Sequence, residues 1–294
     1  MNFLTRIVEY KKKEIATARK RIPESVLRGK SLHIQGKRSF RRKLARPDHT
    51  GVNIIAEIKR ASPSKGVICA DLDAARQAAA YEHGGAAAIS VLTDRHFFSG
   101  SPADLAAARQ ATTLPVLRKD FLISSYQILE SGALGADAIL LIVRILSENQ
   151  LHDYLALCRE LELDVLVEIH CRQDLETALQ AGADLIGINN RNLTSFETDT
   201  QTAARLAGGL GPGKTAVAAS GICSQADIKT GLNAGIHNFL IGESLVRSPD
   251  PAAMLQTLKA CGQAQGLPAA HARGKNAGAD PASAHLPEQK KQIR

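Results

Sequence analysis

The chain has 294 residues, of which 44% are hydrophobic, and it carries a formal net charge of +8. This size and composition are typical of a globular protein with one large α/β domain or two ordinary ones. The longest apolar run, "AILLIV", has only the length of a strand, and the N-terminus lacks the apolar segment of a signal peptide, so we expect no membrane partner. The five cysteines form no C-x-x-C pair and indicate reduced thiols, which predicts a cytoplasmic protein.

The positive charge is concentrated near the N-terminus. Residues 1–50 contain 15 Lys/Arg and 4 Asp/Glu, whereas residues 51–260 carry a net charge of −6. The apolar residues of the first segment have helical spacing, at Phe3, Leu4, Ile7, Val8 and Ile15. Few aromatics accompany the basic residues, so they favour a solvated helix face over an electrostatic partner site, and we expect no nucleic-acid partner. Residues 1–50 are therefore predicted to form an N-terminal helical extension.

From residue 51 onward, short β-branched runs alternate with loops and alanine-rich helical runs. We predict strands at 52–58, 86–92, 115–119, 137–143, 164–169, 184–189, 215–220 and 238–242. We predict helices at 71–83, 102–110, 124–134, 147–161, 172–181, 199–207, 224–234 and 251–260. Eight such units predict an α/β fold, a (β/α)8 TIM barrel over residues 51–261. A doubly wound open sheet is the alternative, but its G-x-G-x-x-G turn is absent.

Two further features support this division of the chain. Three predicted helices end in glycine before the next strand, in "HGGAAA", "LGADAI" and "AGADLI", as expected of αβ connections. Residues 262–294 are rich in Ala, Gly, Pro and charge, a composition that cannot bury enough apolar surface to offset the entropy of ordering. We therefore predict a disordered C-terminal tail.

Charged and polar residues end several of the predicted strands. Glu57 and Lys59 end the first, Lys119 the third, Glu168 the fifth and Asn189 the sixth. The active site of a (β/α)8 barrel lies at the C-terminal ends of its strands, and side chains two residues apart on a strand share a face. These side chains are therefore predicted to meet in the barrel mouth, where lysines and carboxylates can supply acid and base. A structural ion-pair network is the alternative.

The last two strands end in glycine. Backbone N–H groups at Gly221, at Gly242 and at the following residue, Glu243, could cradle a phosphate, as loops after strands seven and eight of this fold often do. Arg191 and Ser62 could add a charge or a hydroxyl. The alternative is that these glycines serve only the turns. Together, these two glycine-containing loops favour a phosphorylated small-molecule substrate.

Two aromatic residues follow the second and third strands. Phe98 and Phe121 could flank a planar ring of a substrate, or they could be core residues. The histidines show no metal-ligand spacing, and the adjacent His170 and Cys171 lack further ligands, so we expect no metal.

Several of these stretches together resemble the indole-3-glycerol-phosphate synthase family. They are "IIAEIKRASPSKG", "SVLTDRHFFSGS", "PVLRKDFLI", "GADAILLIVRIL", "LVEIH", "IGINNRNLTSFETD", "ASGI" and "FLIGESLVRSPDP", within roughly residues 1–260. The resemblance implies a carboxy-lyase of tryptophan biosynthesis that uses no cofactor or metal. Its substrate would be 1-(2-carboxyphenylamino)-1-deoxyribulose 5-phosphate, which closes a ring and loses CO2 and water to give indole-3-glycerol phosphate.

The resemblance also implies a role for each matching residue. Lys119 resembles the general acid of ring closure, Glu168 and Lys59 the acid/base partners of dehydration, Glu57 the carboxylate that orients the lysines, and Asn189 the amide that binds substrate hydroxyls. The implied substrate-binding residues are Ser62, Pro63, Phe98, Phe121, Arg191, Leu193 and Ser220, and the implied phosphate-binding residues are Gly221, Gly242 and Glu243.

One position departs from the family pattern. The family has "ESGI" after strand seven, whereas this chain has "AASGI", with Ala219 in place of a substrate-binding glutamate. Two other functions stay open: an isomerase of a phosphorylated aminoketose, which would need a Cys/Asp or Asp/Asp pair, and a non-catalytic ligand-binding barrel. We expect a monomer that could contact other tryptophan-pathway enzymes.

Overall fold

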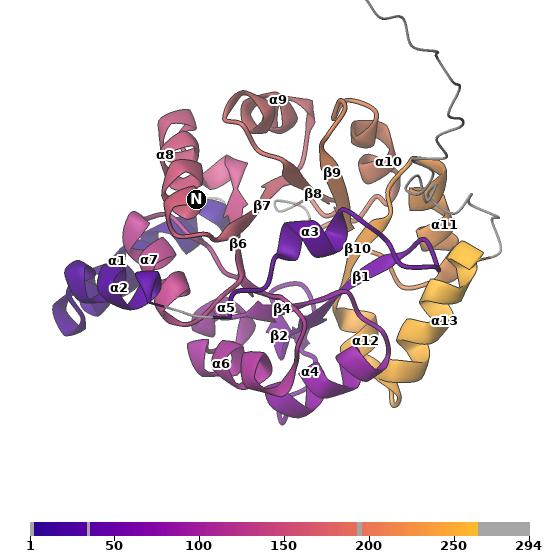
Figure 1. Cartoon of the computed structure of the whole chain (residues 1–294), viewed down its shortest axis with the longest axis horizontal. Coiled ribbons are helices and arrows are strands. Elements are labelled where there is room, and N and C mark those ends of the chain that lie inside the picture. The colour runs from indigo at the N-terminus through magenta and orange to yellow at the C-terminus, as the bar shows by residue number, and fades with distance from the viewer. Residues whose placement is uncertain (1–2, 34–35, 193–195, 264–294) are drawn as a thin grey trace, which may run out of the picture.

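The computed structural model describes residues 3–33, 36–192 and 196–263. Eight parallel strands close into a barrel in the order β1-β10-β9-β8-β7-β6-β5-β4 (Figure 1). They are β1 (Asn53–Ile58), β4 (Ala88–Leu92), β5 (Val116–Lys119), β6 (Ala138–Ile142), β7 (Asp164–Ile169), β8 (Leu185–Asn189), β9 (Thr215–Ala219) and β10 (Asn238–Ile241). Each lies within the range predicted for it, and the (β/α)8 barrel is confirmed.

All eight predicted helices of the barrel are present, and they surround the strands (Figure 1). They are α4 (Ala74–His83), α6 (Pro102–Ala111), α7 (Ser125–Ala133), α8 (Glu148–Glu160), α9 (Arg172–Gln180), α10 (Gln201–Ala207), α11 (Gln225–Asn233) and α13 (Pro251–Gln263). Helix α13 continues three residues beyond its predicted end, so the first two residues of the predicted tail are helical. Residues 264–294 lie outside the described residues.

The loops contain five short elements that the sequence analysis does not predict. They are β2 (Ala61–Ser62), β3 (Gly66–Val67), α5 (Arg95–Phe98), η1 (Val143–Ile145) and α12 (Glu243–Arg247). Strands β2 and β3 form an antiparallel hairpin in the loop after β1. All five elements follow the C-terminal ends of barrel strands, where this fold carries its active site.

Local signals explain where the main helices begin and end. Ser147 and Ser224 each form a capping box with the third residue of the following helix, α8 and α11. Gly85, Gly135 and Gly182, which follow α4, α7 and α9, have φ of 82–84°, a left-handed conformation that favours glycine. The expected αβ connections are therefore present.

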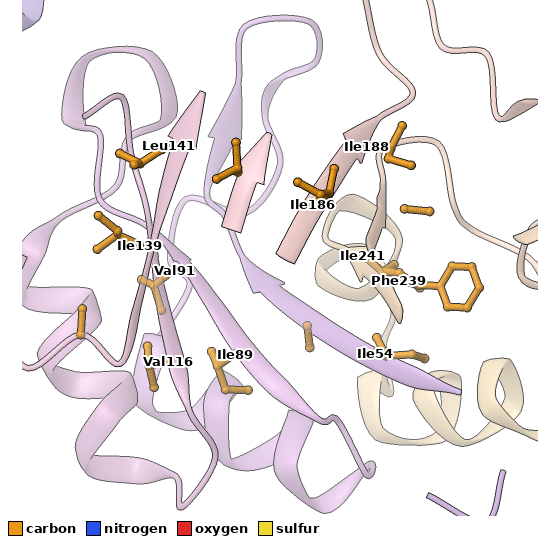
Figure 2. Packing of buried hydrophobic residues seen from close by; sticks show 14 of the residues in the cluster. Ile54, Ile89, Val91, Val116, Ile139, Leu141, Ile186, Ile188, Phe239 and Ile241 are labelled. Carbon is orange, nitrogen blue, oxygen red and sulfur yellow. The ribbon is translucent and has the colours of Figure 1, made fainter. Parts of the chain in front are cut away.

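The barrel has two apolar layers because alternate residues of a strand face opposite sides. Ile54, Ile139 and Leu141 belong to the outer layer, between the strands and the helices (Figure 2). Ile55 and Leu140, one residue away in each strand, belong to the layer that fills the barrel interior. By the same alternation, Glu57 and Lys59 point inward, which puts their charges at the barrel mouth.

The described residues before position 45 contain three helices, α1 (Phe3–Arg21), α2 (Glu24–Leu32) and α3 (Phe40–Leu44). Helix α2 packs along α7. Helix α3 lies across the end of the barrel where the strands begin (Figure 1): Asp164, the first residue of β7, accepts a hydrogen bond from the backbone N–H of Arg41, and Asn53, the first of β1, donates to the carbonyl of Leu44. The predicted helical extension is present, and its helix α3 caps the N-terminal end of the barrel.

Some basic residues of this extension pair with acidic residues of the barrel. Arg28 contacts Glu160 at 2.5 Å, and Arg41 contacts Asp184 at 3.3 Å. Most of these side chains are exposed, as predicted for a solvated helix face. The prediction is wrong for Lys11, whose side chain is only 1% exposed because it enters the barrel mouth between buried carboxylates. In the described ranges, we find no helix that is long and apolar enough to cross a membrane.

Candidate active site

Three charged side chains meet where β1 and β5 end. The ammonium nitrogen of Lys59 lies 2.7 Å from Glu57 Oε1, and that of Lys119 lies 3.7 Å from Glu57 Oε2. The Glu57 side chain is 4% exposed, whereas those of Lys59 and Lys119 are 16% and 19% exposed. The carboxylate is therefore buried beneath two ammonium groups that a ligand can reach.

Each charge stabilises the others. Burial alone would raise the pKa of Glu57, but Lys59 and Lys119 outweigh it and hold that pKa below its ordinary value. Burial alone would lower the pKa of Lys119, but Glu57 and Glu168 outweigh it and raise that pKa. Glu57 thus stays ionised and Lys119 stays protonated near neutral pH.

Glu168 forms a second polar group on the opposite side of the mouth. It lies in β7, is 4% exposed, and its Oε1 accepts a hydrogen bond of 3.1 Å from the side-chain amide of Asn189, the last residue of β8. The backbone N–H of Arg191 donates to the Asn189 side-chain oxygen at 3.0 Å, which fixes the orientation of the amide. Asn189 therefore holds one carboxylate oxygen of Glu168 in place.

These groups line a cavity of about 460 Å³ at the C-terminal end of the barrel. Every site residue that was predicted from the sequence and that the structure describes lines it: Glu57, Lys59, Ser62, Pro63, Phe98, Lys119, Phe121, Glu168, Asn189, Arg191, Ser220, Gly221, Gly242 and Glu243. Leu193, the remaining one, lies outside the described residues. The cavity has the size of a small-molecule site.

The cavity has an aromatic wall. The rings of Phe98 and Phe121 lie 6.0 Å apart, tilted by 40°. Phe3, from helix α1, also lines the cavity and packs edge-on against Phe97 and Phe196, with centroids at 5.6 and 5.2 Å. This wall can accept a planar ring.

The opposite part of the cavity has features of an anion site. Ser220 and Gly221 both have positive φ, 69° and 76°, so the chain turns sharply after β9. A Cβ atom on Gly221 would lie 2.3 Å from a Thr198 methyl group, and one on Gly242 would lie 2.5 Å from Glu57 Oε1, so both positions require glycine. The hydroxyl of Ser244 is buried against this part of the cavity and has no hydrogen-bond partner among the described residues.

Arg191 joins two of the loops around the mouth. Its guanidinium donates to the Ser64 hydroxyl at 3.0 Å, in the hairpin after β1, and to the carbonyl of Phe196 at 3.4 Å. Arg191 therefore lines the cavity while it holds these loops together.

Ala219 faces the same cavity. It is the last residue of β9, it is 5% exposed, and its register partners are Asn189 and Leu240, which also line the mouth. The nearby Asp227 does not replace the missing glutamate, because its Oδ2 accepts hydrogen bonds from the backbone N–H groups of Cys223 and Ser224. A methyl group therefore stands where the family pattern has a carboxylate.

Sequence reasoning missed several residues that line the cavity. Phe3 and Leu4 come from the N-terminal extension, whose helical spacing does not reveal that its first turn reaches the mouth. Phe196 comes from the loop after β8. Ser244 and Arg247 follow β10; the position of Ser244, two residues after Gly242, was a usable signal for a phosphate ligand.

A family model and individual relatives match this chain to the same family. A family model described as indole-3-glycerol phosphate synthase matches residues 4–258. The chain belongs to this family. A relative of that name from Desulfosudis oleivorans is 56% identical over 259 residues, which cover 87% of this chain and 98% of the relative. A second, from Syntrophobacter fumaroxidans, is 51% identical over 257 residues, or 87% of this chain and 97% of the relative.

Solved structures of other proteins share the fold alone. A 3-hexulose-6-phosphate synthase is 13% identical, with a TM-score of 0.58 over 71% of this chain and 99% of that protein. A thiamine phosphate pyrophosphorylase from Pyrococcus furiosus is 14% identical, with a TM-score of 0.54 over 73% of this chain and 96% of that protein.

Proposed function

We propose that this member of the family is an active carboxy-lyase, an indole-3-glycerol-phosphate synthase of tryptophan biosynthesis. It would convert 1-(2-carboxyphenylamino)-1-deoxyribulose 5-phosphate to indole-3-glycerol phosphate, CO2 and water. The observation that carries this proposal is the convergence of two ammonium groups and two carboxylates on one cavity, between an aromatic wall and an anion site.

Ring closure is assigned to the cluster at β1 and β5. As the aromatic carbon attacks the carbonyl carbon, negative charge develops on the carbonyl oxygen and must be neutralised. Lys119 donates the proton, since Glu57 and Glu168 raise its pKa and keep it charged beforehand. Lys59 holds the substrate carboxylate, which is released as CO2 once the new bond has formed, and Glu57 orients both lysines.

Dehydration is assigned to Glu168 and Lys59. A hydroxyl leaves as water while a proton is removed, so the step requires an acid and a base. Glu168 serves this step with one oxygen fixed by Asn189, and the same amide is in position to bind a substrate hydroxyl.

Substrate binding is assigned to the two ends of the cavity. The anthranilate ring lies against Phe98 and Phe121, and the phosphate lies against the backbone at Gly221, Gly242 and Glu243. Ser62, Pro63, Leu193 and Ser220 complete the substrate-binding set, and Arg191 adds positive charge.

The cellular setting is part of the same proposal. All five cysteines are free thiols, which supports a reducing compartment such as the cytoplasm. Only five large hydrophobic side chains of the described residues are exposed, which supports a monomer; contact with other pathway enzymes stays an expectation. Among the described residues, no group of three or more His, Cys, Asp or Glu side chains could hold a metal ion, and we expect turnover without one.

The proposal is tested with the purified full chain and the named substrate, by the fluorescence of the indole product, with and without a chelator. We expect turnover that the chelator does not change. We expect Glu168→Gln, which keeps the shape of the side chain but cannot exchange protons, to lower kcat by about 10² or more. An increase in KM alone would show that Glu168 binds substrate and is not the base.

A further inference from the structure

His170 lies directly behind Glu168. It follows the end of β7 two residues after Glu168, so the two side chains share a face of the strand. The ring is only 3% exposed, and neither of its nitrogens has a hydrogen-bond partner within the described ranges. The nearest carboxylates lie on opposite sides of the ring: Nε2 is 3.5 Å from Glu168 Oε1, and Nδ1 is 3.7 Å from Asp174 Oδ2.

Asp174, in the first turn of α9, is a fixed negative charge. Its Oδ2 accepts a hydrogen bond of 2.8 Å from the backbone N–H of His170 and one of 3.0 Å from Nε of Arg144. Burial alone would raise the pKa of Asp174, but its contacts with His170, Cys171 and Arg144 outweigh burial and hold that pKa well below its ordinary value.

Packing alone does not account for an imidazole at this position. An apolar side chain of similar size would fill the space without removing two polar nitrogens from water, which is unfavourable when they lack partners. The charged groups that face His170 are Glu168 on its own strand and Asp174 on α9, with Arg144 behind Asp174. Asn189 contacts the same Glu168 oxygen from β8.

We propose that His170 is a positioning residue for Glu168, with which it shares one proton. With a neutral ring, Nδ1–H donates to Asp174 and Nε2 accepts the proton of a protonated Glu168. When that proton moves from Oε1 to Nε2, the ring becomes an imidazolium that donates to both carboxylates, and Glu168 becomes ionised. The total charge is unchanged, and the bridge persists in both states.

The two carboxylate oxygens of Glu168 therefore have different roles. Oε1 accepts the hydrogen bond of Asn189 and faces His170 Nε2 at 3.5 Å, which leaves Oε2 for the substrate. The role of His170 rests on the proposed function, because it assumes that Glu168 acts in the dehydration step.

The first test is a pair of substitutions at His170. His170→Leu removes both nitrogens, and we expect kcat to fall by about 10- to 100-fold while KM changes by less than about threefold. His170→Gln can donate to Glu168 but cannot exchange a proton, and it should recover at least about threefold of the lost kcat. Arg172→Gln is the matched control, with kcat within about twofold of the unmodified chain, because the Arg172 side chain is 73% exposed and pairs with Glu176 on the outer face of α9.

Single-turnover measurements then separate positioning from a general loss of structure. Since Glu168 is assigned to the step after CO2 leaves, His170→Leu should release CO2 at the normal rate and form the indole product late. Asp174→Asn should also lower kcat, and it should have no further effect in the His170→Leu background, because the two residues act through one contact.

The outcomes separate the two proposals. If the unmodified chain shows no turnover, the proposed function is wrong and the role of His170 is wrong with it. If the unmodified chain turns over and His170→Leu keeps kcat within about twofold, only the role of His170 is wrong. If His170→Leu does not fold, normal kcat in both His170→Gln and Asp174→Asn would overturn the proposal.

Discussion

Replacing Lys11 with methionine tests how the N-terminal extension is attached to the barrel mouth. The Lys11 ammonium lies 2.9 Å from Asp94 and 2.8 Å from Asp120, and these carboxylates are 0% and 3% exposed. Methionine keeps the length of the side chain and removes its charge. The substitution therefore leaves two buried carboxylates without their cation.

The size of the effect follows from this burial. Removing one partner from a buried ion pair costs about 3–5 kcal/mol. Asp120 keeps contacts with Arg118 at 3.4 Å and with the Thr93 hydroxyl at 2.6 Å, which favours the lower end of that range. For a domain of this size, about 1 kcal/mol shifts Tm by roughly 2–4 °C, so we expect Tm to fall by roughly 6–20 °C.

The dependence on pH gives a second, independent readout. Burial alone would raise the pKa of Asp120, but Lys11 and Arg118 outweigh it and lower that pKa in the folded protein. A carboxylate with a lowered folded pKa stabilises the protein above its unfolded pKa of about 3.9, and this stability is lost as the pH falls. Asp120 can become neutral in acid once Lys11 is removed, so the penalty of Lys11→Met should be smaller at pH 4 than at pH 7.

Thermal unfolding by circular dichroism at both pH values measures these shifts. The matched control is Lys12→Met, because the Lys12 side chain is 61% exposed and its partner Glu9 is 49% exposed. The control should change Tm by no more than about 4 °C, since solvent screens an exposed ion pair and such a pair contributes little to stability. A shift for Lys11→Met no larger than that of Lys12→Met, or one that is equal at both pH values, would refute the reasoning.

Four further predictions follow from the site. Lys119→Ala should lower kcat by about 10² or more with binding within about tenfold, as judged by steady-state kinetics; near-normal turnover would remove Lys119 from the mechanism. Ala219→Glu should raise kcat/KM by about 10- to 100-fold, since a charged hydrogen bond contributes about 1.5–3 kcal/mol; an unchanged or lower value would show that the mouth has repacked around the alanine. Gly242→Ala should lower kcat/KM by at least about tenfold, because its Cβ would displace the Glu57 carboxylate; unchanged kinetics would show that the carboxylate can move without loss. Truncation after Gln263 should leave both Tm and activity unchanged, and a drop of several degrees would show that residues 264–294 pack on the barrel.

The barrel and its charged mouth were predictable because both depend on local patterns. A continuous apolar strand such as β6 is buried on both faces, and its run of β-branched and leucine residues marks it directly. A charged residue at the end of such a strand, as at Lys119, has a fixed place in this fold. The glycines that follow β9 and β10 were predictable for the same reason, because a glycine directly after a strand is visible in the local sequence.

The remaining features depend on contacts between distant segments. Lys11 belongs to a helix with basic neighbours, and only its approach to Asp120, more than a hundred positions away, makes it buried. His170 is close in the sequence to Glu168 and Asp174, but without metal-ligand spacing nothing singled it out, and the turn from β7 into α9 places the two carboxylates at opposite ring nitrogens. Helical spacing could not show that Phe3 reaches the cavity.

The most direct test of the central claim is analysis of the products after complete turnover of 1-(2-carboxyphenylamino)-1-deoxyribulose 5-phosphate by the purified full chain. The barrel mouth, with its two lysines, its two carboxylates and its proposed phosphate-binding loops, predicts one CO2 and one indole-3-glycerol phosphate for each substrate consumed. Recovery of unchanged substrate, or of an isomer with its carboxyl group retained, would contradict the account.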